Sequence, residues 1–226
     1  MRQLALDLQL PEPFGFDDFL IGPNLEVFTC LKDLADDRLP EKAAYLWGEA
    51  GVGKTHLLRA TVARASEAGL HACYWDAALE PLGEMAHGYD LLAVDHIERL
   101  DQDGQVVMFG LYNAQRERGC ALVAAGELPP ARLPLRDDLQ TRLGWGLVFH
   151  VEAPADEDKA ALLRHRARVR GCEIGEEVCR YLVTHTSRDL GSLTRLIDRL
   201  DHAALAAQRP LTLPFVREAL KRDELE

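Results

Sequence analysis

The chain has 226 residues, 47% of them hydrophobic and 28% charged, which is the composition of an ordinary globular protein with one large core. Its formal net charge is −11, from 37 acidic and 26 basic residues. Proteins that bind duplex DNA usually concentrate Lys and Arg on one face, so this balance disfavours strong direct DNA binding. No apolar run approaches the roughly 20 residues that span a bilayer. The N-terminus also reaches Asp7 too soon for a secretory signal, so we expect a cytoplasmic protein without membrane contact.

The N-terminal region begins with a segment that reads as an extended tail over residues 1–13, which contains Pro11 and ends at Pro13. Apolar residues then recur at helical spacing between positions 24 and 37, which predicts a helix there. The run AAYLW at 43–47 predicts a buried strand, and the segment after residue 54 predicts a helix that Gly69 ends.

Further apolar runs alternate with helical segments up to about residue 153. The predicted strands after the first are HACYW, LLAV, ALVAA and LVFHV, and the clearest helix between them is QVVMFGLYNAQRERG at 105–119. Strands that alternate with helices indicate a mostly parallel sheet covered on both faces.

The pattern changes after Pro154, where helix-like segments follow one another without a strand between them. We therefore predict three parts: a tail over 1–13, an α/β domain over 14–153, and a helical lid over 154–226.

The segment WGEAGVGKTH at 47–56 fits the spacing G-x-x-x-x-G-K-S/T of a phosphate-binding loop. In such loops, backbone N–H groups and a helix N-terminus surround the phosphates, the Lys reaches the β- and γ-phosphates, and the hydroxyl ligates Mg²⁺. A predicted strand precedes the motif and a predicted helix follows it, which lowers the risk of a chance match. The candidate nucleotide-binding residues of this segment are Gly48, Gly51, Gly53, Lys54, Thr55 and His56.

A second acidic element is expected at the end of an apolar strand, where an Asp holds the magnesium. YDLLAVDHIE at 89–98 supplies it, with Asp95 as the candidate Mg²⁺ ligand beside Thr55. The next position is His96, a neutral imidazole without the fixed negative charge that favours proton removal from water. The alternative for His96 is a plain surface residue, and Glu98 can take its place only if the backbone re-aims the Glu98 side chain. We expect slow intrinsic hydrolysis of ATP, and no autonomous enzyme.

These motifs resemble those of the DnaA-related AAA+ family of replication proteins. LWGEAGVGKTHLL resembles the phosphate loop of DnaA-type initiators, and FDDFLIGPN at 16–24 is similar to the segment that frames the adenine in them. RLGWGL lies in a stretch that resembles the arginine-finger region, and SRDLGSL at 187–193 resembles the lid motif with the second sensor. The resemblance implies an AAA+ P-loop core with a parallel five-stranded sheet and a C-terminal helical lid. It covers about residues 14–200.

Two features set this sequence apart from a DnaA initiator. The sequence ends within a helix or so of the lid motif, so neither a DNA-binding domain nor an N-terminal interaction domain is expected. The N-terminal QLALDL instead resembles the motif with which many proteins bind the bacterial sliding clamp, the β subunit of the replicative polymerase. The alternative is a plain edge strand, because its leucines alternate with period two. The candidate clamp-binding residues are Gln3, Leu4, Leu6 and Leu8.

Together these features resemble the Hda family, whose members inactivate the DnaA initiator. The resemblance implies a protein that binds ADP, sits on the clamp at the nucleoid, and stimulates ATP hydrolysis by DnaA. Arg142 would be the arginine finger that acts in trans on the initiator's ATP. The alternative is a surface salt bridge of Arg142 with Asp137 or Asp138, and Arg136 is a weaker candidate for the finger.

Two more nucleotide contacts follow from the resemblance. Arg188 would reach this protein's own nucleotide from the lid, unless it caps a helix or pairs with Asp189. Glu127 lies where the first sensor is expected. Its carboxylate is on a longer side chain than that of Asp, and a carboxylate near the phosphates agrees better with bound ADP than with bound ATP.

Three questions stay open at this level. The resting nucleotide is ADP or ATP, and a homo-oligomer is plausible because AAA+ proteins usually hold nucleotide at subunit junctions. A helicase loader or an initiator-recruiting adaptor is an alternative function. An autonomous remodelling ATPase is a further alternative, which His96 disfavours.

Overall fold

The computed structural model describes residues 15–82, 88–169, 172, 174–186 and 190–221. Five parallel strands form one sheet in the order β2-β3-β4-β1-β5. Their bounds are Ala43–Trp47 (β1), Ala72–Asp76 (β2), Leu91–Asp95 (β3), Ala121–Gly126 (β4) and Leu147–His150 (β5). The five predicted strands are confirmed to within one residue at each end. Strand β2 extends to Asp76 because that residue pairs in register with Asp95 of β3.

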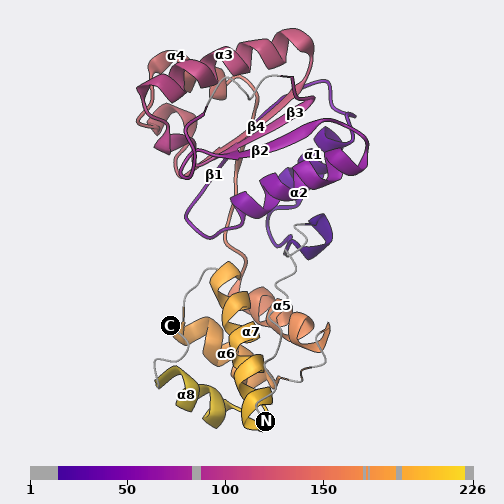
Figure 1. The fold of residues 1–226 in the computed structure, drawn as a ribbon, viewed down its shortest axis with the longest axis vertical. Coiled ribbons are helices and arrows are strands. Elements are labelled where there is room, and N and C mark those ends of the chain that lie inside the picture. Colours follow the sequence, from indigo (N-terminus) through magenta and orange to yellow (C-terminus); the bar gives the residue numbers. More distant parts are fainter. Residues whose placement is uncertain (1–14, 83–87, 170–171, 173, 187–189, 222–226) are drawn as a thin grey trace, which may run out of the picture.

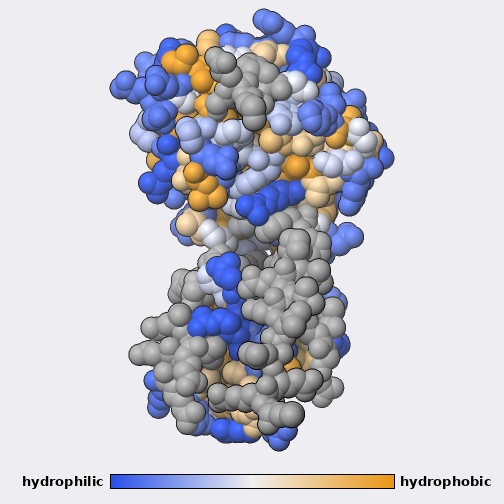
Figure 2. Space-filling model, viewed as in Figure 1, coloured by the Kyte–Doolittle hydropathy of each residue, from blue (hydrophilic) through white to orange (hydrophobic). Residues whose placement is uncertain are grey.

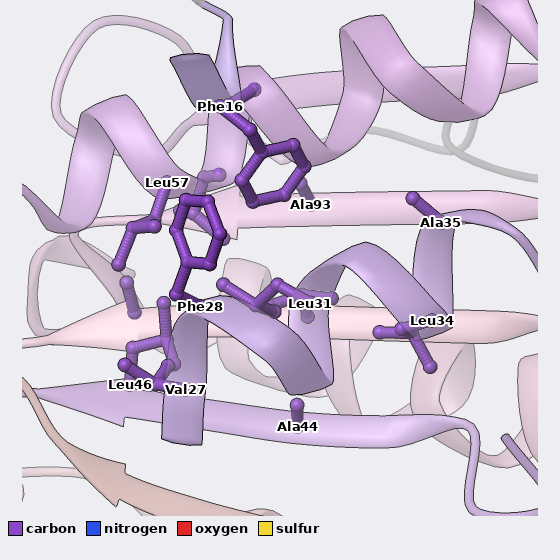
Figure 3. Close-up of a cluster of buried hydrophobic side chains, with 14 of the residues drawn as sticks. Phe16, Val27, Phe28, Leu31, Leu34, Ala35, Ala44, Leu46, Leu57 and Ala93 are labelled. Carbon is purple, nitrogen blue, oxygen red and sulfur yellow. The ribbon is translucent and has the colours of Figure 1, made fainter. Parts of the chain in front are cut away.

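One face of the sheet is covered by α1 (Leu25–Ala35) and α2 (Lys54–Glu67), as Figure 1 shows. The apolar side of α1 packs on the sheet, and Leu31 and Leu34 lie close to the buried residues of β1 (Figure 3). The ring of Phe16 from the short turn Phe16–Asp18 meets Phe28 edge to face at 5.3 Å between centroids. This core therefore fixes the segment before α1 against the helices on that face.

The other face carries α3 (Gln102–Arg118) and α4 (Asp137–Leu143) (Figure 1). Helix α3 begins at the cap residue Asp101, whose side chain accepts a hydrogen bond from the Gly104 N–H, and it ends at the left-handed Gly119. Helix α4 was not predicted from the sequence, because seven residues are too few to show a helical period of apolar residues. Its Gln140 side chain donates to the carbonyls of Leu133 and Leu135, which fastens the preceding loop to it.

The helices after β5 form a separate bundle in Figure 1. Their bounds are Asp156–Val169 (α5), Glu176–His185 (α6), Leu190–Ala207 (α7) and Leu213–Lys221 (α8). They share their own apolar core, which includes the buried Leu182, Leu193 and Val216. The expected class, an α/β fold with a helical lid region, is confirmed.

The described surface in Figure 2 is mostly hydrophilic, with hydrophobic residues scattered over it. Within the described residues, no helix has the length and apolarity that a membrane crossing requires.

We predict opposite effects of alanine at two glycines. Gly146 lies beside β1, where an added Cβ would come within 2.8 Å of the Ala43 carbonyl carbon and would contact its oxygen more closely still. Gly110 lies on the exposed side of α3 with nothing within 4 Å of such a Cβ. Gly146→Ala should lower the free energy of unfolding by about 1–3 kcal/mol. Gly110→Ala should leave it unchanged or raise it by up to ~1 kcal/mol.

Urea unfolding followed by circular dichroism measures both values. Equal stability of the Gly146 variant and the parent would contradict the close approach of β5 to β1.

Candidate functional site

The loop between β1 and α2 has the backbone of a phosphate-binding turn. Gly48, Gly51 and Gly53 have φ values of 155°, 77° and 105°. Gly53 precedes the first residue of α2 and caps it without a side-chain hydrogen bond. A Cβ at Gly53 would also lie 2.8 Å from Cε2 of Phe19. A glycine is therefore required there, and the N-terminus of a 14-residue helix is left without a side-chain cap, which favours an anion.

The Lys54 side chain is buried against this loop. Its Nζ donates hydrogen bonds to the carbonyl oxygens of Gly48 at 2.7 Å and Glu49 at 2.8 Å. Burial lowers the pKa of Lys54, and the negative charges of Asp95, Glu98 and Glu127 oppose that shift. The ammonium group thus lies within the electrostatic reach of all three carboxylates, and the predicted Lys54, Asp95 and Glu127 are brought together.

Asp95 ends β3 with a side chain that is 1% exposed. Its carboxylate accepts hydrogen bonds from the Tyr74 hydroxyl at 3.0 Å and from the His96 N–H at 2.9 Å. Burial, and then the Asp95 charge, raise the pKa of Tyr74, so the phenol stays a donor to Asp95. Thr55 lies in the first turn of α2. A hydroxyl and a carboxylate are the hard oxygen donors that Mg²⁺ prefers, so Thr55 and Asp95 fit a magnesium site.

His96 is turned away from the phosphate loop. It adopts the left-handed conformation with φ 51°, and its Nδ1 lies 2.8 Å from Oδ1 of Asp76 at the end of β2. Strand β2 lies at one edge of the sheet, whereas the loop follows β1, two strands beyond β3. His96 is therefore neither a free surface residue nor placed to act on phosphates.

Glu98 points to the other side of β3. The left-handed His96 leads into a short 3-10 turn, Ile97–Arg99, and this turn re-aims the Glu98 side chain. A Cβ on Gly126, the last residue of β4, would lie 2.9 Å from Oε2 of Glu98. The sequence indicated Glu98 as a candidate but did not predict the 3-10 turn that aims it, because no sequence pattern marks a left-handed histidine.

Of the remaining predicted nucleotide- and clamp-binding residues, Glu127 and His56 lie within the described part of the chain and the others lie outside it. Glu127 follows β4 directly and is exposed. The His56 Nε2 lies 2.9 Å from the Gly15 carbonyl oxygen and its ring packs against Phe19, so it ties the segment before α1 to α2. Arg188 and the tail residues Gln3, Leu4, Leu6 and Leu8 lie outside the described residues.

Arg142 belongs to a second site, at the end of α4. Its guanidinium carbon lies 3.9 Å from the ring centroid of Trp145 and 5.4 Å from that of Phe109. Arg116 contacts the same Trp145 ring at 4.9 Å, and Trp145 is 51% exposed.

The expected alternative for Arg142, a salt bridge with a neighbouring aspartate, is not found among the described residues. Asp138 pairs instead with Arg136, at 2.7 Å between Nη2 and Oδ2. The Arg142 side chain is only partly buried. Its neighbour Trp145 lines a cavity of about 570 Å³, together with Arg116 and the chain before β1. Arg142 is thus held by aromatic rings, and no carboxylate in the described part of the chain neutralises its charge.

Comparison with known proteins finds a family match for the lid and a structural likeness for the whole chain. Residues 156–220 match the family model described as "Hda, lid domain". The whole fold is similar to domain III of the replication initiation protein DnaA from Thermotoga maritima, with a TM-score of 0.82 and 22% identity over 96% of this chain and 99% of that one.

Two further solved structures are similar at lower scores. AMPPCP-bound DnaA from Aquifex aeolicus has a TM-score of 0.69 and 22% identity over 81% of this chain and 64% of that chain. A RuvB variant from Thermotoga maritima has a TM-score of 0.70 and 17% identity over 92% of this chain and 72% of that chain. At these identities the likeness shows the fold alone, and the family match is confined to the lid. Residues 156–220 therefore match the lid domain of the Hda family, and the whole chain shares the fold of DnaA domain III.

Proposed function

We propose that this protein is a nucleotide-bound regulator of replication initiation that stimulates ATP hydrolysis by the DnaA initiator. The observation that carries the proposal is the state of Arg142: a guanidinium stacked on the exposed Trp145, with no carboxylate partner among the described residues. The Hda-family lid and the DnaA-like fold support the choice of DnaA as the partner.

The protein's own nucleotide would bind at the loop between β1 and α2. The uncapped N-terminus of α2 and the buried Lys54 would hold the phosphates, and Thr55 and Asp95 would ligate Mg²⁺. His56, Glu127 and Arg188 are proposed to complete the site. A similar DnaA structure contains AMPPCP, which supports a nucleotide here, and we propose ADP as the resting ligand.

Arg142 would act on a nucleotide held by the initiator. Hydrolysis builds negative charge on the transferring phosphoryl group, and an arginine supplied by another protein stabilises that charge, worth about 10³–10⁵ in rate in known cases. A guanidinium suits this task because it is always charged and binds phosphate oxygens in a two-pronged fashion. The aromatic rings around Arg142 hold the side chain without neutralising it.

The N-terminal tail would bring the protein to its place of action. Gln3, Leu4, Leu6 and Leu8 are proposed to dock on the sliding clamp in extended form, with the leucines in an apolar pocket. Binding to the clamp would keep the protein at newly replicated DNA in the cytoplasm without strong DNA contacts of its own.

We predict that Lys54→Ala lowers the affinity for ADP at least about tenfold, because a charged donor to the phosphates is lost. Lys42→Ala is the matched control, since its ammonium pairs with Asp37 at 2.5 Å away from the loop. Calorimetric titration with ADP and Mg²⁺ measures both. Equal affinities of the two variants would contradict the assignment of the loop.

We predict that Arg142→Ala reduces the stimulation of DnaA ATPase at least about 100-fold, because charge on the transferring phosphoryl group goes unstabilised. Phosphate release by ATP-bound DnaA is measured with clamp-loaded DNA and ADP. Nucleotide and clamp binding by the variant should stay normal.

Arg136→Ala is the control for this experiment, because Arg136 lies in the same segment but is paired with Asp138. Undiminished stimulation by the Arg142 variant, or an equal loss in both variants, would overturn the arginine-finger assignment.

We predict that replacing Gln3 and Leu4 together with Ala abolishes co-elution with the sliding clamp, because the polar and apolar anchors of the tail are removed. Size-exclusion chromatography of the mixture measures complex formation. Normal co-elution of the double variant would show that the tail is not the anchor.

A further inference from the structure

The Glu98 carboxylate is buried in an unusual state. Both of its oxygens are inaccessible to solvent, and neither has a hydrogen-bond partner within the described part of the chain. Buried polar atoms are normally hydrogen-bonded, and an unpaired buried carboxylate is especially costly. Such a group calls for an explanation in terms of function.

A hydroxyl group beside Glu98, among the residues that the structure describes, donates its hydrogen bond elsewhere. The Tyr45 hydroxyl, which lies beside Gly126 as Glu98 does, donates to the Leu128 carbonyl oxygen at 2.7 Å. Burial and then the Glu98 charge raise the pKa of Tyr45, so the two groups are close enough to interact. A Cβ on Gly126 would approach the Tyr45 hydroxyl at 2.5 Å and Oε2 of Glu98 at 2.9 Å, so only glycine leaves room for both.

Glu98 also lies near the start of the phosphate loop, because its Oε2 is close to Gly126, which pairs in register with Trp47 at the end of β1. Its charge acts on the pKa of the buried Lys54, second only to that of Asp95 among the carboxylates. Asp95 has two donors of its own, and Glu127 is exposed, so solvent screens its charge. Of these three carboxylates, that of Glu98 alone is both buried and without a hydrogen-bond donor among the described residues.

We propose that Glu98 sets the nucleotide preference of this site, favouring a nucleoside diphosphate over a triphosphate. A triphosphate adds a further negatively charged group beside Lys54. A desolvated carboxylate repels that charge more strongly than an exposed one does, because the local dielectric is low. This inference rests on the proposed function, in which ADP is the resting ligand, and it assigns that preference to one residue.

The test is the ratio of the dissociation constants for ADP and for a non-hydrolysable ATP analogue, both with Mg²⁺. The parent protein should bind ADP more tightly. Glu98→Gln keeps the shape beside Gly126 and removes the charge, so it should shift the ratio towards the triphosphate on the order of tenfold. The ADP affinity itself should change much less.

Three further variants make the result specific. Glu98→Ala also removes the charge and should shift the ratio in the same direction, whereas Glu98→Asp retains the charge and should keep the preference. Glu67→Gln removes an exposed carboxylate from the last residue of α2, far from the loop, and should leave the ratio unchanged. Circular dichroism checks that each variant is folded.

Two results would overturn the proposal: a parent protein with no preference for ADP, or an unchanged ratio in both Glu98→Gln and Glu98→Ala. An unchanged ratio together with loss of intrinsic phosphate release would assign Glu98 to hydrolysis instead. None of these results bears on stimulation of DnaA by Arg142, which is measured at another site, so the two proposals fail separately.

Discussion

The structure depends on β4, the strand that lies between β1 and β3 in the sheet. All six of its residues are buried, and it ends in Ala124, Ala125 and Gly126. Parallel pairing places the carboxyl ends of β1, β3 and β4 at one edge, so the phosphate loop, Asp95 and Glu127 follow neighbouring strands. The small residues at the end of β4 leave space for side chains from both neighbours. The candidate nucleotide site is thus a consequence of strand order and of one glycine.

The sequence predicted the strands and helices well where their patterns were long. The loop, its glycines and Lys54 were found because the motif has fixed spacing, and Asp95 because it ends an apolar strand. Helix α4 was missed because seven residues hardly show a period. The direction of His96 and Glu98 was also beyond prediction, since one left-handed residue decides which of them lies near the loop.

The stacking around Arg142 was equally invisible in the sequence. Phe109 and Arg116 come from α3, about 30 residues before Arg142 and Trp145, and only the packing of α3 against α4 brings them to the same ring. A neighbouring aspartate was the simpler expectation for Arg142, but Asp138 is taken by Arg136. Stacking restrains a long side chain while leaving its charge available, whereas a salt bridge would restrain it and neutralise it.

The two sites lie towards opposite ends of the strands, and this supports separate roles for them. Strand β5 pairs in parallel with β1, with Ala44 opposite Leu147 and Trp47 opposite His150. The phosphate loop leaves the carboxyl end of β1, whereas Arg142 precedes the amino end of β5. Successive residues of a strand advance about 3.3 Å, so these two ends are about 10 Å apart along the paired strands. Arg142 therefore lies away from the loop that carries Lys54, as the proposed action on a nucleotide held by another molecule requires. This separation agrees with the proposed roles, in which the chain holds one nucleotide at its own loop and Arg142 acts on a second one held by a partner.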